Sequence, residues 1–194
     1  TKNIFKNSKI RVPFFIPNIT DDDKKLVSQT LDSGLLTNGP NLSKFEYSFS
    51  KYTKSNYSVG VSSATAALHL SLKALGIGKD DQVIVPDLTF VASPNSVEMV
   101  GGKINLIDIE KKSLNIDISK IKSMVTKKTK AIMPVDFNGR SANLDELKEM
   151  YLQIIGDNKD LDGINANEDI LNLINNIDII SKSLSSIKNA PYLY

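Results

Sequence analysis

The chain has 194 residues, of which 41% are hydrophobic and 24% charged, with a formal net charge of +2. This balance is typical of a soluble globular protein, offers no concentrated basic face for nucleic acid, and includes no apolar run near the roughly 20 residues that span a bilayer. Cysteine is absent and His69 is the single histidine, which excludes disulfides, thiolate catalysis and a cysteine- or histidine-rich metal centre. We therefore expect no metal site and neither a membrane nor a nucleic-acid partner. Because no signal peptide is visible at the start, we expect a cytoplasmic location.

Two helical signals come first along the chain. Thr20 is a suitable N-cap, and the three aspartates after it suit the positive end of a helix dipole. Gly34 can end this helix, and residues 35–41 are typical of a loop. Pro40 fits the first turn of a second helix. The apolar stripe of that helix consists of Leu42, Phe45, Phe49 and Tyr52.

Strand and helix signals then alternate as far as residue 155. Short apolar segments predict four strands, at 57–61, 82–86, 104–109 and 130–137. Helices are predicted between and after them, at 64–75, 90–100, 117–125 and 143–155. Strands separated by helices pair in parallel, with helices on both faces of the sheet. The predicted fold is therefore an α/β parallel-sheet domain that binds ligands at the carboxyl ends of its strands.

The composition changes after Tyr151, where Ile and Asn become frequent and the alternation of strands and helices is lost. We therefore predict one domain over residues 1–150 and a divergent tail, without an assigned fold, over residues 151–194. Asn167 is a suitable cap for a helix within this tail. The apolar stripe of that helix would consist of Ile170, Ile174, Ile177 and Leu184.

The segment 59–70 carries the clearest functional signal. A predicted strand ends in Ser62 and Ser63 and turns directly into a helix. Free amides at a helix N-terminus carry partial positive charge, small side chains let an anion approach, and Ser63 and Thr65 add hydroxyl donors. The pattern predicts a phosphate site. The alternative is ordinary N-capping by serine and threonine.

A second signal follows the next predicted strand, again at a carboxyl end. Phe90 lies in the segment 86–93, where its ring could lie flat against a planar cofactor. The alternative is an aromatic core residue at the start of a helix.

Together, these segments resemble the sugar aminotransferases of the DegT/DnrJ/StrS type, which are fold-type-I enzymes that use pyridoxal 5′-phosphate (PLP). The resemblance extends from about residue 12 to residue 149. The matching segments are 33–40, Phe45-Glu46, 62–69, 75–78, 83–86, 89–92, 128–135 and Asn138-Gly139. The order and spacing of these segments support the resemblance to the family. The resemblance implies the large domain of such an enzyme, truncated at its C-terminus.

The resemblance also implies roles for residues of the two signals. Thr65 and Ala66, next to the hydroxyl of Ser63, match the residues that bind the PLP phosphate. Phe90 matches the aromatic residue that stacks on the pyridine ring. His69 lies inside the helix and is expected to be structural.

A substrate and an assembly are implied as well. Thr37, Asn38 and Gly39 match a loop that lines the sugar-nucleotide site. The implied reaction moves an amino group, usually from glutamate, to a keto-sugar nucleotide for polysaccharide biosynthesis. The implied assembly is a homodimer.

The family further needs a Schiff-base lysine and an aspartate that keeps the pyridine nitrogen protonated. Asp157, within 154–160, is a degenerate match to the aspartate, and Lys188, within 183–189, keeps the spacing of the lysine motif. However, the alanines after the aspartate are missing, Leu184 replaces phenylalanine, and no glycine-rich segment follows Lys188. The alternatives are that both residues are solvated surface charges and that the chain is a catalytically inactive, truncated or frame-disrupted fragment.

A rival interpretation of the tail is a calcium-binding loop. Five residues fall at the ligand and glycine positions of an EF-hand loop: Asn158, Asp160, Asp162, Gly163 and Asp169. The first aspartate and the final glutamate of that pattern are replaced, and Asn165 stands at the central apolar position. A polar loop is the simpler alternative.

Overall fold

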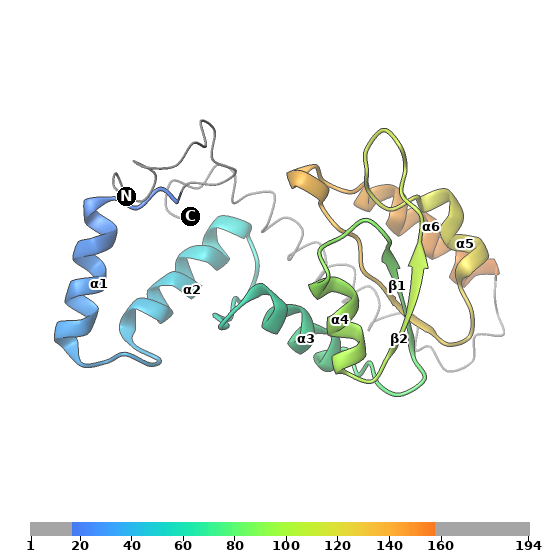
Figure 1. Ribbon diagram of the computed structural model, residues 1–194. Helices are drawn as coiled ribbons and strands as arrows, with labels where there is room; N and C mark the ends of the chain where they lie inside the picture. Colours follow the sequence, from blue (N-terminus) through green and yellow to red (C-terminus); the bar gives the residue numbers. More distant parts are fainter. Residues whose placement is uncertain (1–16, 158–194) are drawn as a thin grey trace, which may run out of the picture. The chain divides into compact units, whose positions relative to one another are not determined.

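The computed structural model describes residues 17–157, whose helices and strands are shown in Figure 1. These residues form two compact units, 17–60 and 61–157. Within them no helix is both long and apolar enough to cross a bilayer. The predicted tail helix and the calcium-binding interpretation fall on residues 158–194, which lie outside the described residues.

Two helices make up the first unit. α1 (Asp21–Ser33) begins at Thr20, whose Oγ1 accepts the Asp23 N–H at 3.2 Å while the Asp23 carboxylate accepts the Thr20 N–H at 2.6 Å. Gly34 ends α1 with a left-handed φ of 68°. α2 (Pro40–Thr53) begins with its proline. Both predicted helices are confirmed, yet neither buries a residue, so the described part of this unit has no hydrophobic core.

A parallel sheet organises the second unit. β1 (Gln82–Pro86) lies in the middle, with β2 (Lys103–Ile107) on one side and β3 (Thr129–Ile132) on the other. The last four residues of β1 are buried, which is typical of a strand covered on both faces. The predicted α/β fold with parallel strands is confirmed.

In the described part of the chain, four helices cover the two faces of this sheet: α3 (Ala64–Ala74), α4 (Ala92–Met99), α5 (Ile118–Met124) and α6 (Leu144–Asp157). Val83 and Val85 of β1 belong to one core cluster, with α3 and α4. Ile84, between them, belongs to a second cluster, with α5 and α6. Because successive side chains of a strand leave opposite faces, the two clusters lie on opposite sides of the sheet.

The segment 57–61 is not the strand that its apolar pattern predicts. It is irregular, and Tyr57 is 85% and Val59 78% exposed. A strand must satisfy its backbone groups on a neighbouring strand, and the described residues provide none here. This prediction was wrong because a short apolar segment does not by itself supply a partner strand.

Two strands end earlier than predicted. β2 stops short of residue 109 because Ile109 pairs with Ile116 in an isolated antiparallel bridge. β3 stops short of residue 137, and Pro134 just after it has no N–H to donate to a neighbouring strand. A short 3-10 turn, η1 (Phe137–Gly139), follows β3.

Candidate functional site

The N-terminus of α3 carries the predicted phosphate site. Ser63 is the N-cap: its Oγ accepts the Ala66 N–H at 3.1 Å, and its carbonyl accepts the Ala67 N–H at 3.0 Å. The N–H groups of Ala64 and Thr65 belong to the first turn, where no helix carbonyl can accept them. N-capping and anion binding are therefore compatible, because the Ser63 hydroxyl proton and these two amides can still donate to a ligand.

The segment just before this helix is fastened to α2. The Glu46 carboxylate accepts the Gly60 N–H at 2.7 Å, and the Ser58 hydroxyl donates to the Glu46 carbonyl. A Cβ at Gly60 would meet Cδ1 of Leu42, at the flexible end of that side chain, which would have to shift to make room. In the sequence, Glu46 belongs only to the two-residue match Phe45-Glu46, and no local pattern indicates a role for it. The structure shows that it holds the chain that leads to α3.

Phe90 lies in the loop between β1 and α4, and it is 77% exposed. Hydrogen bonds hold this loop: the Phe90 carbonyl accepts the Ser93 N–H at 3.0 Å, and the hydroxyl oxygens of Thr89 and Ser93 lie 2.9 Å apart. The alternative that Phe90 is a core aromatic is wrong. Its ring is instead available to stack on a planar ligand.

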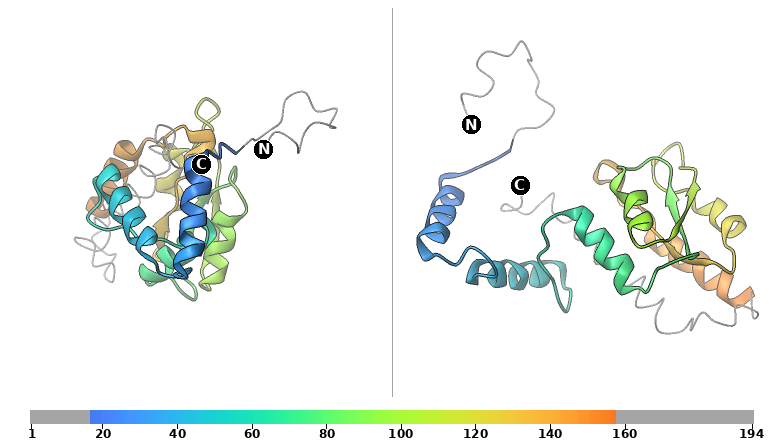
Figure 2. Two further views of the ribbon diagram at one scale, coloured as in Figure 1. Left: turned by 90° about the vertical axis from the view of Figure 1, so that its left-hand side faces the viewer. Right: turned by 60° about the horizontal axis from the view of Figure 1, so that its bottom comes forward.

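The two segments are brought together by the packing of their helices. α3 and α4 contact each other over the same face of the sheet (Figure 2). Each helix leads into the amino end of the strand that follows it, so the N-terminal ends of both lie toward the carboxyl edge of the sheet. Ligands of such sheets bind at this edge.

The loop matched to a sugar-nucleotide site lies in the first unit, between α1 and α2. Thr37 and Asn38 are exposed, and Asn38 has a left-handed φ of 46°. A Cβ on Gly39 would lie 2.8 Å from the Leu35 carbonyl oxygen, so the backbone itself explains this glycine. These three matched residues belong to the unit 17–60, whereas those matched to the cofactor belong to the unit 61–157.

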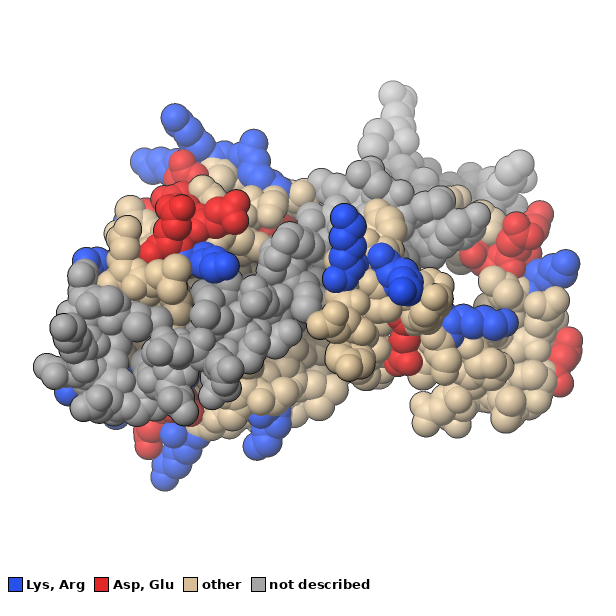
Figure 3. All heavy atoms as spheres, turned by 180° about the vertical axis from the view of Figure 1, so that it is seen from behind, with Lys and Arg blue, Asp and Glu red and all other residues tan. Residues whose placement is uncertain are grey.

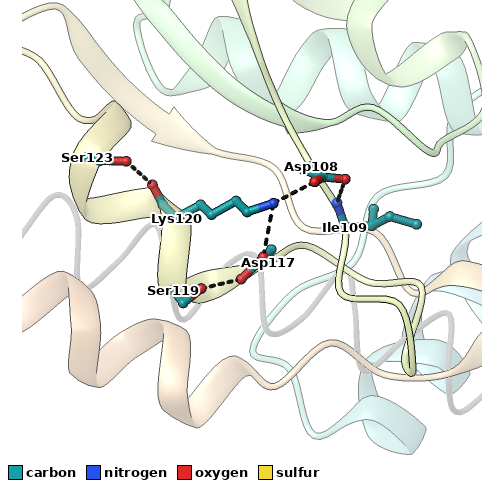
Figure 4. Close-up of polar contacts among 6 residues, drawn as sticks. All are labelled: Asp108, Ile109, Asp117, Ser119, Lys120 and Ser123. Carbon is teal, nitrogen blue, oxygen red and sulfur yellow. Dashed lines mark hydrogen bonds and ion pairs between the residues drawn. The ribbon is translucent and has the colours of Figure 1, made fainter.

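Charged residues near the carboxyl end of β2 form one cluster (Figure 4). Lys120 of α5 pairs with Asp108, directly after β2, and lies 3.4 Å from Asp117, which accepts the Ser119 hydroxyl at 2.6 Å. The hydrogen bond from Lys120 lowers the pKa of Asp108, and the one from Ser119 lowers the pKa of Asp117. The bond to Asp108 raises the pKa of Lys120. These groups bind one another and fasten the start of α5 to the end of β2.

Basic and acidic residues are interspersed over the described part of the face shown in Figure 3, so that face has no field of a single sign. Within residues 17–157, no group of three histidine, cysteine, aspartate or glutamate side chains is arranged to hold a metal ion.

The two residues predicted to act in catalysis, Asp157 and Lys188, cannot be located relative to this site. Asp157 is the last residue of α6, and its side chain lies outside the described ones, as does the whole of Lys188. The resemblance implies a strand for the aspartate, whereas the chain is helical at Asp157. The roles of both residues stay predictions.

Comparison with known proteins places this geometry among aminotransferases. The sequence profile of the DegT/DnrJ/EryC1/StrS aminotransferase family matches residues 17–155. SpsC, the spore coat polysaccharide biosynthesis protein of Bacillus subtilis (strain 168), is 40% identical over 136 residues, which are 70% of this chain and 35% of SpsC.

The chain is also similar to solved structures of PLP-binding proteins. Spr1654 from Streptococcus pneumoniae, a proposed sugar aminotransferase in its PMP form, is 36% identical with a TM-score of 0.71, over 73% of this chain and 36% of its own. The E. coli GDP-4-keto-6-deoxy-D-mannose-3-dehydratase with bound hydrated PLP is 33% identical with a TM-score of 0.67, over 74% of this chain and 38% of its own. The chain thus spans little more than a third of the length of these relatives.

Proposed function

The chain belongs to the DegT/DnrJ/EryC1/StrS aminotransferase family, and from this premise we propose that it carries the cofactor-binding part of a PLP-dependent aminotransferase. The proposed substrate is a keto-sugar nucleotide, used for polysaccharide biosynthesis. One observation carries the proposal: two contacting helices present hydrogen-bond donors, at the start of α3, and an exposed aromatic ring, just before α4. A phosphate group needs the first and a pyridine ring needs the second.

The residues present fit PLP. The Ser63 hydroxyl, together with the amide and hydroxyl of Thr65, would donate to the phosphate. The Ala66 N–H holds the Ser63 Oγ and so orients this hydroxyl, while the small Ala66 side chain leaves room for an anion. The ring of Phe90 would stack on the pyridine. When bound, PLP supplies an electron-accepting ring for amino transfer.

The proposal assigns two more roles by resemblance. Lys188 would bind the cofactor covalently and carry a proton between substrate and cofactor carbons. Asp157 would keep the pyridine nitrogen protonated.

The wider assignment also rests on the resemblance. Thr37, Asn38 and Gly39 would line the sugar-nucleotide site. Glutamate as the amino donor, a homodimer and a cytoplasmic location belong to the same proposal.

A second candidate function is binding of PLP, or of an anion, without catalysis. No alanines directly follow Asp157, and Leu184 stands where the resemblance leads us to expect a phenylalanine before Lys188. These departures favour a chain in which the phosphate site at the start of α3 binds PLP or an anion, but no lysine forms a Schiff base.

A visible-absorption titration of the purified chain with PLP separates the candidates. Wild type and the control Lys182→Ala should show a bound band that differs from that of free PLP, and Lys188→Ala should lose it. A band that survives in Lys188→Ala removes Lys188 from the mechanism. Saturable binding without such a band in the wild type favours the non-catalytic candidate, and no binding at all overturns the proposal.

The same titration tests whether Phe90 stacks on the pyridine ring of PLP. Phe90→Ala should weaken PLP binding about fivefold, because aromatic stacking contributes roughly 1 kcal/mol beyond burial. Phe90→Tyr keeps the ring and should keep the affinity. Val91→Ala is the matched control, since Val91 is the exposed neighbour. Equal affinities of Phe90→Ala and the wild type would exclude Phe90 from the site.

A further inference from the structure

Asn115 is a buried amide in the loop between β2 and α5, and only 4% of it is exposed. Its Nδ2 donates to the Arg140 carbonyl at 3.0 Å, and its Oδ1 accepts the Phe137 N–H at 3.1 Å. A single side chain therefore serves both a donor and an acceptor of the turn that follows β3. A buried amide is tolerated when both kinds of bond are made and costs free energy when one is lost.

The same two loops are joined a second time. The Arg140 guanidinium donates through Nη1 to the Lys112 carbonyl at 2.6 Å. The turn benefits from such support, because Asn138 and Gly139 have consecutive left-handed φ values of 51° and 73°, a region that side-chain-bearing residues seldom adopt. The loop after β2 thus holds the turn after β3 in its shape.

The joined loops flank the strand that leads to Phe90. β1 lies between β2 and β3, and the loop after it carries that ring. Ile116, next to Asn115, belongs to the same core cluster as Ile84 of β1. The loop that carries Asn115 is therefore anchored in the core that packs against β1. Because the carboxyl ends of parallel strands meet at one edge of a sheet, the turn after β3 and the Phe90 loop both follow strands that end at this edge.

We infer that Asn115 is a positioning residue for the cofactor site: it fixes the turn 137–140 in the conformation that lets this edge of the sheet bind PLP. The inference rests on the proposed function. Asn115 acts through the turn, because it is buried and its amide bonds to Phe137 and Arg140.

Replacement by aspartate tests this role. When ionised, Asn115→Asp keeps the acceptor for Phe137 but loses the donor to Arg140. Asn105→Asp is the matched control, because Asn105 also donates to a backbone carbonyl, that of Met124 at 3.3 Å, but from within β2. At pH 8 we expect PLP affinity about tenfold weaker than wild type for Asn115→Asp, the size of one lost hydrogen bond, and within about twofold for the control.

A pH profile adds a signature that a merely structural role would not give. At pH 5 the buried carboxyl of Asn115→Asp takes up a proton, since burial favours its neutral form, and it can again donate to Arg140. Its PLP affinity, relative to wild type at the same pH, should then recover. Hydrogen exchange of segment 136–142 without PLP should be faster in Asn115→Asp than in Asn105→Asp.

The outcomes are separable. Equal PLP affinity of Asn115→Asp and the wild type, or equal losses in the two aspartate variants, overturns the inference. If Asn115→Asp does not fold, Ser113→Ala takes its place. This substitution removes only the Ser113 hydroxyl, which accepts the Asn115 N–H at 3.2 Å. It should give a smaller loss of PLP affinity. A wild-type chain that binds no PLP overturns the proposed function, and the inference with it.

Discussion

The phenol of Tyr151, on α6, is buried and has no hydrogen-bond partner in the described part of the chain. Burial raises its pKa from 10.0 to about 12, because the phenolate loses hydration there. An unsatisfied buried hydroxyl also costs free energy in the folded state. At the scale of a single residue, this group is a local cost to stability that the proposed function does not use.

Tyr151→Phe should therefore leave the melting temperature at pH 7 unchanged or raise it. The wild type should lose stability between pH 10 and pH 12, because the unfolded tyrosine ionises near 10.0 while the folded one keeps its proton to about 12. The variant should lack this loss. Thermal unfolding followed by circular dichroism from pH 7 to pH 12 measures both effects. Tyr57→Phe, at an exposed position, is the control. A lower melting temperature of Tyr151→Phe at pH 7 would contradict the prediction, because it would show that the Tyr151 hydroxyl makes a stabilising hydrogen bond.

At the scale of elements, the cluster of Asp108, Asp117 and Lys120 joins the end of β2 to the start of α5. All three residues are charged groups near the surface, where a single ion pair contributes little because water screens it. The lowered pKa values of the two aspartates and the raised pKa of Lys120 nevertheless agree that the paired state is favoured in the fold.

Lys120→Met should lower the melting temperature at pH 7 in a salt-dependent way. The aspartates contribute stability above their ordinary pKa of 3.8, and it is lost as the pH falls through their lower folded values. Lys120 contributes below its ordinary pKa of 10.5, and that contribution is lost as the pH rises through its higher folded value. The difference from wild type should thus be largest between about pH 5 and pH 10 and vanish in acid. Lys127→Met serves as the control, and a difference that persists unchanged below pH 3 would refute the ion-pair explanation.

At the scale of the whole molecule, the two units differ in how they are stabilised. The helices of the first unit bury no residue. The second unit has two core clusters on opposite faces of β1, and three residues of that strand, from Val83 to Val85, are fully buried. Burial of apolar surface is the main stabilising contribution to folding, so the stability of the described chain is concentrated in residues 61–157.

Ile84→Ala should remove about 2–5 kcal/mol from the free energy of unfolding of the second unit, because it leaves a cavity in a core that cannot fully close. Hydrogen exchange measured by mass spectrometry should show faster exchange in the helices and strands of 61–157 and unchanged exchange in α1 and α2. Leu106→Ala, at an exposed position of β2, should change little. Equal effects of the two substitutions would contradict the assignment of Ile84 to the core.

Local chemistry determined many of the elements. Thr20 and Gly34 set the ends of α1, and Pro40 sets the start of α2, through hydrogen bonds and dihedral limits that reach only a few residues. The apolar run of 82–86 predicted β1 with its observed bounds, because a strand covered on both faces carries an uninterrupted apolar signal. The N-cap at Ser63 could likewise be predicted from the sequence, because its hydrogen-bond partners lie within four residues.

The sequence by itself therefore determined the helices, the central strand, the parallel α/β class and the family. Only the tertiary structure decided that 57–61 is irregular, that the ring of Phe90 is exposed and that Asn115 holds the turn after β3. The physical reason is range: caps and periodicity act between neighbours in the chain, whereas strand pairing and burial depend on residues far away in sequence. Asn115 and Phe137 are 22 positions apart, and no local pattern marks their contact.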